Sequence, residues 1–316
     1  MGSYLFEVEH GLVNKRAFIF PGQGSQYVGM AKDIYENSTS AKQLVEEAED
    51  AIKFNISKVM FEGPVENLKS TDITQPALFL HSALLLNELK NHNPDVVAGH
   101  SLGELTALYS AESLNFTDAI KLIRKRGEAM LSAGEKESGS MAAIIGMDGE
   151  TIENICLESS NNGIVQCANF NSPGQIVISG SSNSVKKVMT VAKDNGARLV
   201  KELVVSGAFH SPLMNHAVEL FSTTLDEVNF EDAKVPVYAN VTAQTVTAKN
   251  EIKELLVKQL TAPVKWQQSI ENMINEGVNE FVEIGPGKVL QGLVKRINPN
   301  VSIIGIDKYI DLEKLN

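Results

Sequence analysis

One stretch of the sequence, residues 95–107, constrains the fold more than any other. It reads DVVAGHSLGELTA: an apolar strand, a sharp turn with Ser101 at its tip, and then a helix. This order is typical of a nucleophile elbow, a strained turn that exposes the serine hydroxyl above an α/β sheet. Side chains two residues before and after the serine would collide with the neighbouring strand and helix, and Gly99 and Gly103 have none. The stretch therefore predicts an α/β fold with a serine nucleophile.

The position of Ser101 at a helix N-terminus adds to this interpretation. Free backbone N–H groups and the positive end of the helix dipole would stabilise an oxyanion formed beside the hydroxyl. The G-x-S-x-G pattern alone also occurs by chance in surface turns. The apolar strand before it and the helix after it favour a catalytic serine over a structural turn.

Composition excludes several other classes of protein. The chain has 316 residues, 43% of them hydrophobic, which suits one large α/β domain with or without a small insert. The formal net charge of −11 argues against nucleic-acid binding. Cys156 and Cys167 have no metal or CxxC spacing, so we expect no metal and a reducing, cytoplasmic location. No apolar run reaches membrane-spanning length, and residues 1–16 lack a signal-peptide core, leaving a natural extension or a cloning remnant.

The order of predicted elements divides the chain into two domains. We expect a large domain from residues 17–134 and 207–316, with a small domain inserted at residues 135–206. The small domain reads strand, helix, strand, strand, helix, strand, which is the ferredoxin-like order. A polar hinge at 133–139 precedes it. A dinucleotide site after the first strand is disfavoured, because the glycines at 22, 24 and 29 miss the G-x-G-x-x-G spacing.

Several element boundaries in the large domain follow from local patterns. Pro76 suits the first turn of a buried helix that ends near Leu89. Thr117 or Asp118 can cap a second helix that reaches about Ser132. Further elements are expected as a strand at 17–20, a helix at 41–53, a strand at 235–240, helices at 250–260 and 264–276, and a strand at 281–284.

A serine nucleophile requires a base, and imidazole is the usual one. Of the six histidines, His210 is the best candidate, because a Gly- and Pro-bracketed loop holds it between a strand and a helix. The others lie in the N-terminal segment, a buried helix, a polar turn, next to Ser101, or within a helix: His10, His81, His92, His100 and His216. No acidic residue follows a large-domain strand between Ser101 and His210, so we expect a Ser-His dyad with a neutral group orienting the histidine. The helical pattern leaves open whether Arg124 or Arg126 faces this site, or whether both lie at a helix margin.

With these elements placed, the sequence resembles the malonyl-CoA:acyl carrier protein transacylases of bacterial type II fatty acid synthesis. The matching stretches are FPGQGSQ at 20–26, TQPA at 74–77, GHSLGE at 99–104, RG at 126–127, NSPGQIVISG at 171–180, GAFHSPLM at 207–214, QLTAPVKW at 259–266 and EIGPGKVL at 283–290. The resemblance covers the chain from about residue 17 to residue 306. It implies an α/β-hydrolase-like core with a ferredoxin-like insert.

The resemblance also implies roles for individual residues. Ser101 would be the acylated nucleophile, with His210 as its general base and acid. The backbone N–H groups of Gln23 and Leu102 would form the oxyanion hole, and the backbone carbonyl of Gln259 would orient the histidine.

Two further side chains would select the acyl group. Arg126, rather than Arg124, would pair with the malonyl carboxylate. Phe209 would fill the space of an α-methyl group and so favour malonyl over methylmalonyl.

The expected partners are malonyl-CoA and acyl carrier protein, with no cofactor, no nucleic acid, no membrane and a monomeric enzyme. Two basic clusters could dock the carrier protein. One comprises Lys186, Lys187, Lys193, Arg198 and Lys201, and the other Lys288, Lys295 and Arg296. Three alternatives remain open at this stage: a serine thioesterase or esterase, a non-catalytic scaffold, and an acyltransferase of a polyketide pathway.

Overall fold

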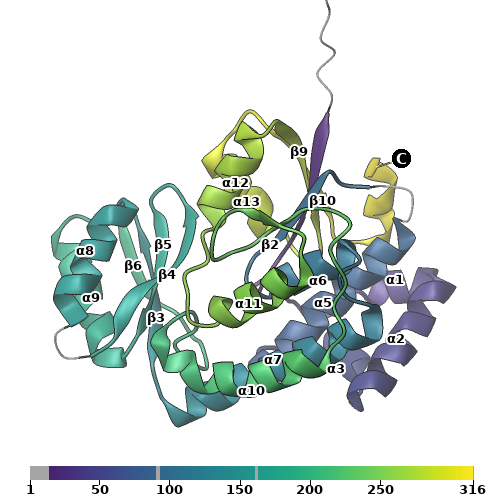
Figure 1. Cartoon of the computed structure of the whole chain (residues 1–316), viewed down its shortest axis with the longest axis horizontal. Helices are drawn as coiled ribbons and strands as arrows, with labels where there is room; N and C mark the ends of the chain where they lie inside the picture. Colours follow the sequence, from purple (N-terminus) through teal and green to yellow (C-terminus); the bar gives the residue numbers. More distant parts are fainter. Residues whose placement is uncertain (1–13, 90–92, 161–162, 316) are drawn as a thin grey trace, which may run out of the picture.

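Two β-sheets, each with its own helices, organise the protein (Figure 1). The structure, a computed structural model, describes residues 14–89, 93–160 and 163–315. The larger sheet has six strands in the order β10-β9-β1-β2-β7-β8, and the smaller has four in the order β4-β5-β3-β6. The architecture is therefore mixed α/β, as the sequence predicts.

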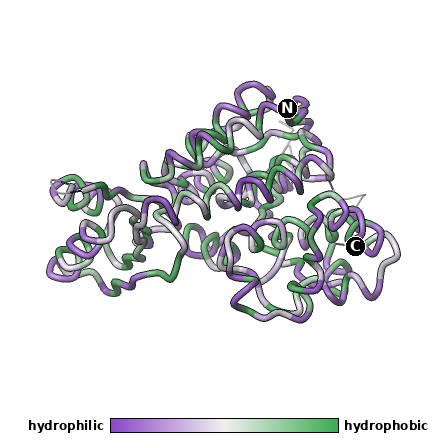
Figure 2. Tube along the Cα trace, turned by 90° about the horizontal axis from the view of Figure 1, so that it is seen from below, coloured by the Kyte–Doolittle hydropathy of each residue, from purple (hydrophilic) through white to green (hydrophobic). Residues whose placement is uncertain are grey.

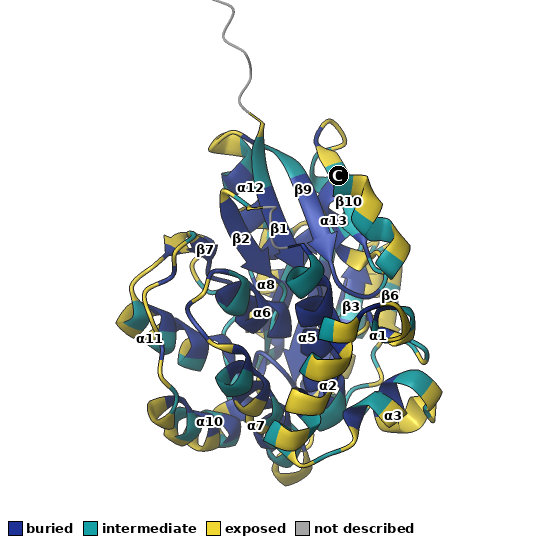
Figure 3. Ribbon diagram, turned by 90° about the vertical axis from the view of Figure 1, so that its right-hand side faces the viewer, coloured by how far each residue is buried: buried dark blue, intermediate teal, exposed yellow. Residues whose placement is uncertain are grey.

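The larger sheet is parallel except at one edge. Its parallel strands are β1 (Lys15–Phe20), β2 (Val96–Gly99), β7 (Val237–Tyr238), β9 (Val278–Ile284) and β10 (Ser302–Ile306). The edge strand β8 (Thr245–Val246) is antiparallel to β7. A parallel sheet is normally buried on both faces, and Figure 3 shows β1 and β2 in the colour of buried residues.

Alternate residues of β1 pack into two separate cores. Phe18 and Phe20 pack on one face, with α5 (Thr71–Glu88), α6 (Leu102–Ser110) and α7 (Phe116–Lys136). Ala17 and Ile19 pack on the other, with α12 (Trp266–Asn275) and α13 (Val289–Ile297). This alternation follows from the period of two along a strand.

Shorter elements surround the first core. They are α1 (Lys32–Asn37), α2 (Thr39–Ile52), α3 (Ile56–Glu62), α4 (Val65–Leu68), η2 (Pro212–Met214), α10 (Asn215–Glu227), α11 (Lys249–Gln259) and η3 (Tyr309–Leu315). The hydrophobic and hydrophilic residues alternate along the outer helices (Figure 2), which is typical of amphipathic helices with one buried face.

The smaller sheet is antiparallel and carries its own core. It contains β3 (Ser140–Ile145), β4 (Val165–Ser172), β5 (Gln175–Gly180) and β6 (Leu199–Glu202), with α8 (Gly149–Ser159) and α9 (Ser182–Asp194). The chain order of strands and helices is the one predicted from the sequence. In Figure 1 this sheet and its helices lie to one side of the larger sheet.

The predicted start of the buried helix at Pro76 was wrong. Helix α5 begins at Thr71, and Pro76 lies inside it. A proline cannot donate the usual hydrogen bond to the carbonyl four residues earlier, which belongs to Asp72. Nη1 of Arg124 donates to that carbonyl instead, over 2.8 Å, so the proline is accommodated within the helix.

The predicted cap and end of the next helix were also wrong. The N-cap of α7 is Asn115, whose Oδ1 accepts from the N–H of Asp118 over 2.8 Å. The helix continues through the expected hinge as far as Lys136. Its last turns pack closely against the chain at Ser206. A Cβ on Gly134 would lie 2.0 Å from the carbonyl oxygen of Ser206.

Other boundaries shift by a few residues. The strand expected at 235–240 is reduced to β7, and its pairing with β8 was not predicted. Strand β1 begins at Lys15, within the segment expected to be an extension, and residues 1–13 lie outside the described residues.

Candidate active site

Ser101 lies at the tip of the turn between β2 and α6, in a backbone conformation with φ of 52°. A φ in this region is strained for a residue with a side chain. The flanking glycines allow it: a Cβ on Gly99 would lie 1.9 Å from the carbonyl carbon of Gly103, and a Cβ on Gly103 would lie 2.1 Å from the carbonyl oxygen of Phe20. The predicted close approach of strand and helix at the elbow is confirmed.

The imidazole of His210 lies beside the serine. Its Nε2 is 2.9 Å from Oγ of Ser101, and its Nδ1 is 2.8 Å from the backbone carbonyl oxygen of Gln259. A carbonyl can only accept, so Nδ1 carries the proton and Nε2 is free to accept the serine proton. Burial, helped by the positive charge of Arg126, lowers the pKa of His210 to about 3, so the ring is neutral at physiological pH.

Arg126, on α7, is 1% exposed and reaches the same point. Its Nη2 donates to Oγ of Ser101 over 3.2 Å and to Oε1 of Gln259 over 2.8 Å, and its Nη1 donates to Oε1 of Gln75 over 2.7 Å. Burial lowers the pKa of Arg126 to about 10, which still leaves it charged near neutral pH. Arg124 instead forms ion pairs with Asp72 and Glu128. Of the two arginines that the sequence left open, Arg126 faces the serine.

The loop after β1 packs closely against the elbow. A Cβ on Gly22 would lie 2.4 Å from the carbonyl oxygen of His100, so this loop approaches the turn at backbone distance. The next residue, Gln23, and the first residue of α6, Leu102, both line the cavity at Ser101. The N–H groups in the first turn of an α-helix have no acceptor within the helix, so Leu102 can donate to a bound group.

A cavity of about 220 Å³ opens over Ser101, between the two sheets. Apolar side chains from both sheet units line it, together with Phe209, the buried neighbour of His210. The apolar lining residues are Met130, Met141, Val177, Leu203, Val205, Val289, Leu290 and Leu293. The site thus combines a serine, a neutral imidazole and a buried guanidinium in a mostly apolar cleft.

The acyl transferase domain family matches residues 17–302 of the chain. A malonyl CoA-acyl carrier protein transacylase of Bacillus subtilis (strain 168) is 46% identical over 297 residues, which are 93% of this chain and 94% of the relative. The chain belongs to the malonyl CoA-acyl carrier protein transacylase family. A second relative with this name, from Staphylococcus aureus (strain MRSA252), is 45% identical over 96% of this chain and 99% of its own length.

Solved structures of transacylases share the fold over nearly the whole chain. An acyl carrier protein S-malonyltransferase from Vibrio cholerae has a TM-score of 0.92 at 38% identity, covering 96% of this chain and 100% of that chain. The malonyl-transacylase PlMCAT, solved in complex with the type II PKS acyl-carrier protein AntF, has a TM-score of 0.92 at 36% identity, covering 95% and 98%. The resemblance seen in the sequence motifs is therefore confirmed.

Two polar residues of this transacylase site were missed by the sequence analysis. Oδ1 of Asn240 accepts from the N–H of Ser101 over 2.7 Å, and Nδ2 of Asn240 donates to the carbonyl of Gly99 over 2.7 Å. Glu104, 3% exposed, accepts from the N–H of Asn240 over 2.9 Å and from Nε2 of Gln259 over 2.8 Å. Burial raises the pKa of Glu104 to about 7. Glu104 belongs to the GHSLGE stretch, which could have indicated it, whereas no local pattern marks Asn240.

Of the other histidines, His100 lines the same cavity as Ser101, and its Nε2 is 2.8 Å from Oδ1 of Asn171. His81 is fully buried, with Nε2 2.8 Å from the carbonyl oxygen of Asp307, and His216 lies in α10. His10 and His92 lie outside the described residues.

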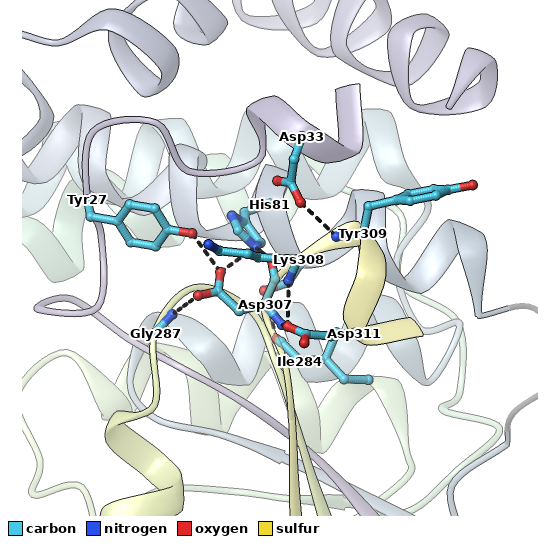
Figure 4. A network of polar contacts seen from close by, with 10 residues as sticks. Tyr27, Asp33, His81, Ile284, Gly287, Asp307, Lys308, Tyr309 and Asp311 are labelled. Carbon is cyan, nitrogen blue, oxygen red and sulfur yellow. Dashed lines mark hydrogen bonds and ion pairs between the residues drawn. The ribbon is translucent and has the colours of Figure 1, made fainter. Parts of the chain in front are cut away.

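A polar network around Asp307 joins the loop after β1 to the turn before α13 (Figure 4). Oδ1 of Asp307 accepts from the hydroxyl of Tyr27 over 2.9 Å, and Oδ2 accepts from the N–H of Gly287 over 3.1 Å. Tyr27 belongs to the loop that carries Gln23, and Gly287 to the turn that leads into α13. One carboxylate therefore anchors both segments.

The described part of the chain comprises residues 14–89, 93–160 and 163–315. No cluster of three or more His, Cys, Asp and Glu side chains among them is arranged to hold a metal ion. None of the helices in these ranges has both the length and the apolar character that crossing a bilayer requires.

Proposed function

We propose that the protein transfers a malonyl group from malonyl-CoA to the phosphopantetheine thiol of an acyl carrier protein, through a malonyl ester on Ser101. The observation that carries this proposal is the buried guanidinium of Arg126, 3.2 Å from the nucleophilic oxygen. A guanidinium fork matches a carboxylate through two charge-assisted hydrogen bonds. A charge at this position favours an acyl group that ends in a carboxylate over a purely apolar one.

In the first half-reaction, Nε2 of His210 accepts the proton of Ser101 while Oγ attacks the thioester carbonyl. The N–H groups of Gln23 and Leu102 stabilise the oxyanion of the tetrahedral intermediate. The intermediate collapses by breaking the carbon–sulfur bond, and the imidazolium of His210 gives its proton to the departing sulfur, so that CoA leaves as a thiol. The products are malonyl-Ser101 and free CoA.

In the second half-reaction, His210 accepts the proton of the carrier thiol as the sulfur attacks the serine ester. Collapse of the second intermediate breaks the carbon–oxygen bond, and His210 returns the proton to Ser101. The carbonyl of Gln259 keeps the imidazole in one tautomer through both halves, 2.8 Å from Nδ1. The apolar cleft disfavours water as a competing nucleophile, so transfer exceeds hydrolysis.

Phe209 is assigned to acyl selection in this proposal. It is buried next to His210 and lines the cavity over Ser101. A bulky ring there reduces the space for an α-methyl substituent on the acyl group. Discrimination by one methyl group is worth only about 1–3 kcal/mol, so methylmalonyl would be slowed and not excluded.

The finer division of the fold is also part of the proposal. Residues 17–134 and 207–316 would form an α/β-hydrolase-like domain, and residues 135–206 an inserted ferredoxin-like domain. The parallel order β10-β9-β1-β2-β7 supports the first assignment, and the antiparallel order β4-β5-β3-β6 with two helices supports the second. The cleft between the two sheets then lies at the junction of the domains.

The proposed enzyme acts in the cytoplasm as a monomer, needs no cofactor, and receives the carrier protein at the cleft mouth. Exposed cations of α9 and β6 offer a docking surface of opposite charge to an acidic carrier. The carrier could serve fatty acid or polyketide synthesis, and a competition assay between the two carrier classes separates them.

Intact-mass spectrometry after mixing with malonyl-CoA tests the proposed function. We expect one malonyl group per protein, absent in Ser101→Ala, and discharged by added carrier protein in its phosphopantetheinylated form. Rapid release of free malonate without carrier would instead indicate a thioesterase, and no acylation at all would indicate a scaffold.

A further inference from the structure

Two buried side chains of opposite charge share one glutamine in the active site. Nε2 of Gln259 donates to Oε2 of Glu104 over 2.8 Å, and Oε1 of Gln259 accepts from Nη2 of Arg126 over 2.8 Å. A carboxylate accepts and a guanidinium only donates, so the amide can satisfy both partners in one orientation only. Gln259 is therefore a fixed bridge between the two charges.

We propose that Glu104 is the internal counter-ion of Arg126 in the free enzyme, and that a malonyl carboxylate replaces it, so that malonylation of Ser101 is coupled to protonation of Glu104. This inference rests on the proposed function, because it takes malonyl as the acyl group and Arg126 as its partner. It adds a residue that touches neither the reacting carbonyl nor the thiol. Glu104 is thus a positioning and charge-balancing residue.

The groups that bond to these two buried charges are all neutral. Arg126 donates to Gln75, Gln259 and Ser101, all of them neutral. Glu104 accepts from the backbone N–H of Asn240 and from Gln259, which are neutral as well. Isolated buried charges are costly, so each of these groups depends on the other for compensation.

A bound malonyl group changes this balance. With its carboxylate on Arg126, the buried site would hold two negative charges and one positive charge. Protonation of one carboxylate restores neutrality. Burial already holds the pKa of Glu104 at about 7, with the charge of Arg126 opposing the rise. When the malonyl carboxylate neutralises Arg126, that opposition weakens and the pKa of Glu104 rises further, so a proton is bound from water.

The other titratable groups near α6 have different partners or do not titrate near neutrality. Burial lowers the pKa of His210 to about 3 and also lowers the pKa of His100. Burial raises the pKa values of Tyr109 and Tyr238 above their usual range. Several charged groups on α5, α7 and β1 bond to groups other than Glu104. They are Asp72 with Arg124, Glu88 with Ser38 and Ser40, His81 with Asp307, Lys125 with Glu128, Lys15 with the carbonyl of Glu276, and Arg16 with Glu280. Glu104 is left as the group that takes up the proton.

The test measures protons and acylation in the same sample. Wild-type protein is mixed with one equivalent of malonyl-CoA, without carrier protein, in weakly buffered solution containing a pH indicator dye. Acylation itself releases CoA as a thiol near pH 7 and consumes no proton. We expect uptake of up to one proton per malonyl-Ser101 formed, largest just above pH 7, and none in Glu104→Gln.

A matched control is Glu283→Gln. Glu283 is also a fully buried carboxyl whose pKa burial raises to about 7, but it accepts from the N–H groups of Leu290 and Gln291 and does not contact Arg126 or Gln259. This variant should retain the proton uptake. In wild type, the malonyl-CoA KM should also rise with pH above 7, by at most about tenfold per pH unit for one linked proton. The KM of Glu104→Gln should be flat over the same range.

Stoichiometric malonylation of wild type without proton uptake between pH 6.5 and 7.5, where the released CoA stays a thiol, would overturn the inference while leaving the proposed function intact. Failure of Ser101 to be malonylated would overturn the proposed function first. The wild-type measurement decides the matter even if Glu104→Gln does not fold.

Discussion

Nδ1 of His210 lies 2.8 Å from the backbone carbonyl oxygen of Gln259, where a serine hydrolase would place a carboxylate. A carbonyl fixes the tautomer but does not stabilise an imidazolium as strongly as a carboxylate does. Burial and the nearby guanidinium lower the pKa of His210 more than the bond to this carbonyl raises it, so the ring is neutral in the free enzyme. The pH dependence of acylation follows from that charge state.

The rate of malonylation should not fall between pH 6.5 and pH 5. The pKa of His210 is lowered to about 3, so the base remains unprotonated and competent throughout this range. A histidine with an ordinary pKa of about 6.5 would be about half deprotonated at pH 6.5 and only about 3% deprotonated at pH 5, a loss of roughly 16-fold. Single-turnover acylation by rapid quench from pH 5 to 8 checks this. A loss of activity that titrates near pH 6.5 would contradict the assignment.

Arg126→Ala should reduce malonyl transfer by about two to three orders of magnitude, because two charge-assisted hydrogen bonds to the substrate carboxylate are lost. Loading of acetyl from acetyl-CoA should rise in the same variant. The matched control is Arg124→Ala, since Arg124 lies two residues away and pairs with Asp72 and Glu128 at the helix margin. Malonylation of Arg126→Ala at the normal rate, with acetyl loading still absent, would show that Arg126 does not read the carboxylate.

Phe209→Ser should improve the use of methylmalonyl-CoA relative to malonyl-CoA by about 10- to 100-fold, the worth of one methyl group in an apolar pocket. The variant removes a buried ring that lines the cavity beside His210. The measurement is kcat/KM for both thioesters with one carrier protein. Equal values for the two thioesters in the wild type, unchanged in the variant, would rule out a selective role for this ring.

Charge reversal of Lys187, Lys193 and Arg198 to Glu should raise the KM for carrier protein and weaken its salt dependence. All three are exposed on α9 or just before β6, whose chain leads to His210. Steering of an acidic partner requires such a local basic cluster, because exposed charges are screened over about 8–10 Å. Malonylation of Ser101 by malonyl-CoA should remain unchanged.

The control for this reversal is a triple change of exposed lysines at Lys42, Lys53 and Lys58, which lie in or next to α2 and α3. In Figure 1 these two helices lie on the right, whereas α9 lies on the left. If the first variant transfers to carrier protein normally, the docking surface lies elsewhere. In the second basic cluster, two of the three side chains already have hydrogen-bond partners. Lys295 donates to the carbonyls of Pro299 and Val301, and Arg296 bonds to Gln175. Lys288 would then be its main candidate.

The parts of the site that the sequence predicted are those that local rules determine. The elbow around Ser101 requires glycines at fixed offsets, and the loop at His210 has its own Gly and Pro signals, so both could be located without coordinates. The element order of the smaller sheet followed from alternating strand and helix patterns. The choice between Arg124 and Arg126 did not follow from a local rule, since the helical period places them at opposite edges of the buried stripe; only the resemblance favoured Arg126.

The parts that sequence reasoning missed depend on contacts between distant segments. Asn240 stands 139 residues from Ser101 and bonds to its backbone N–H, at the end of a strand that is only two residues long. Pro76 lies inside α5 because an arginine 48 residues later serves the carbonyl that the proline leaves without a donor. A propensity rule cannot include a hydrogen bond whose partner lies on another helix.

The carboxylate of Asp307 bonds to both Tyr27 and Gly287, and this has a consequence for inhibitor discovery. A compound that pushes back the loop of Gln23 must also disturb the turn before α13, because both are bound to the same anchor. Widening the cleft on that side is therefore costly. The wall at Leu203 and Val205 follows the short edge strand β6. It is held by the N–H of Leu203, which donates to the carbonyl of Met141, and by a hydroxyl bond between Ser206 and Thr71. Fragments that leave the loop of Gln23 in place should therefore bind more tightly than fragments that displace it.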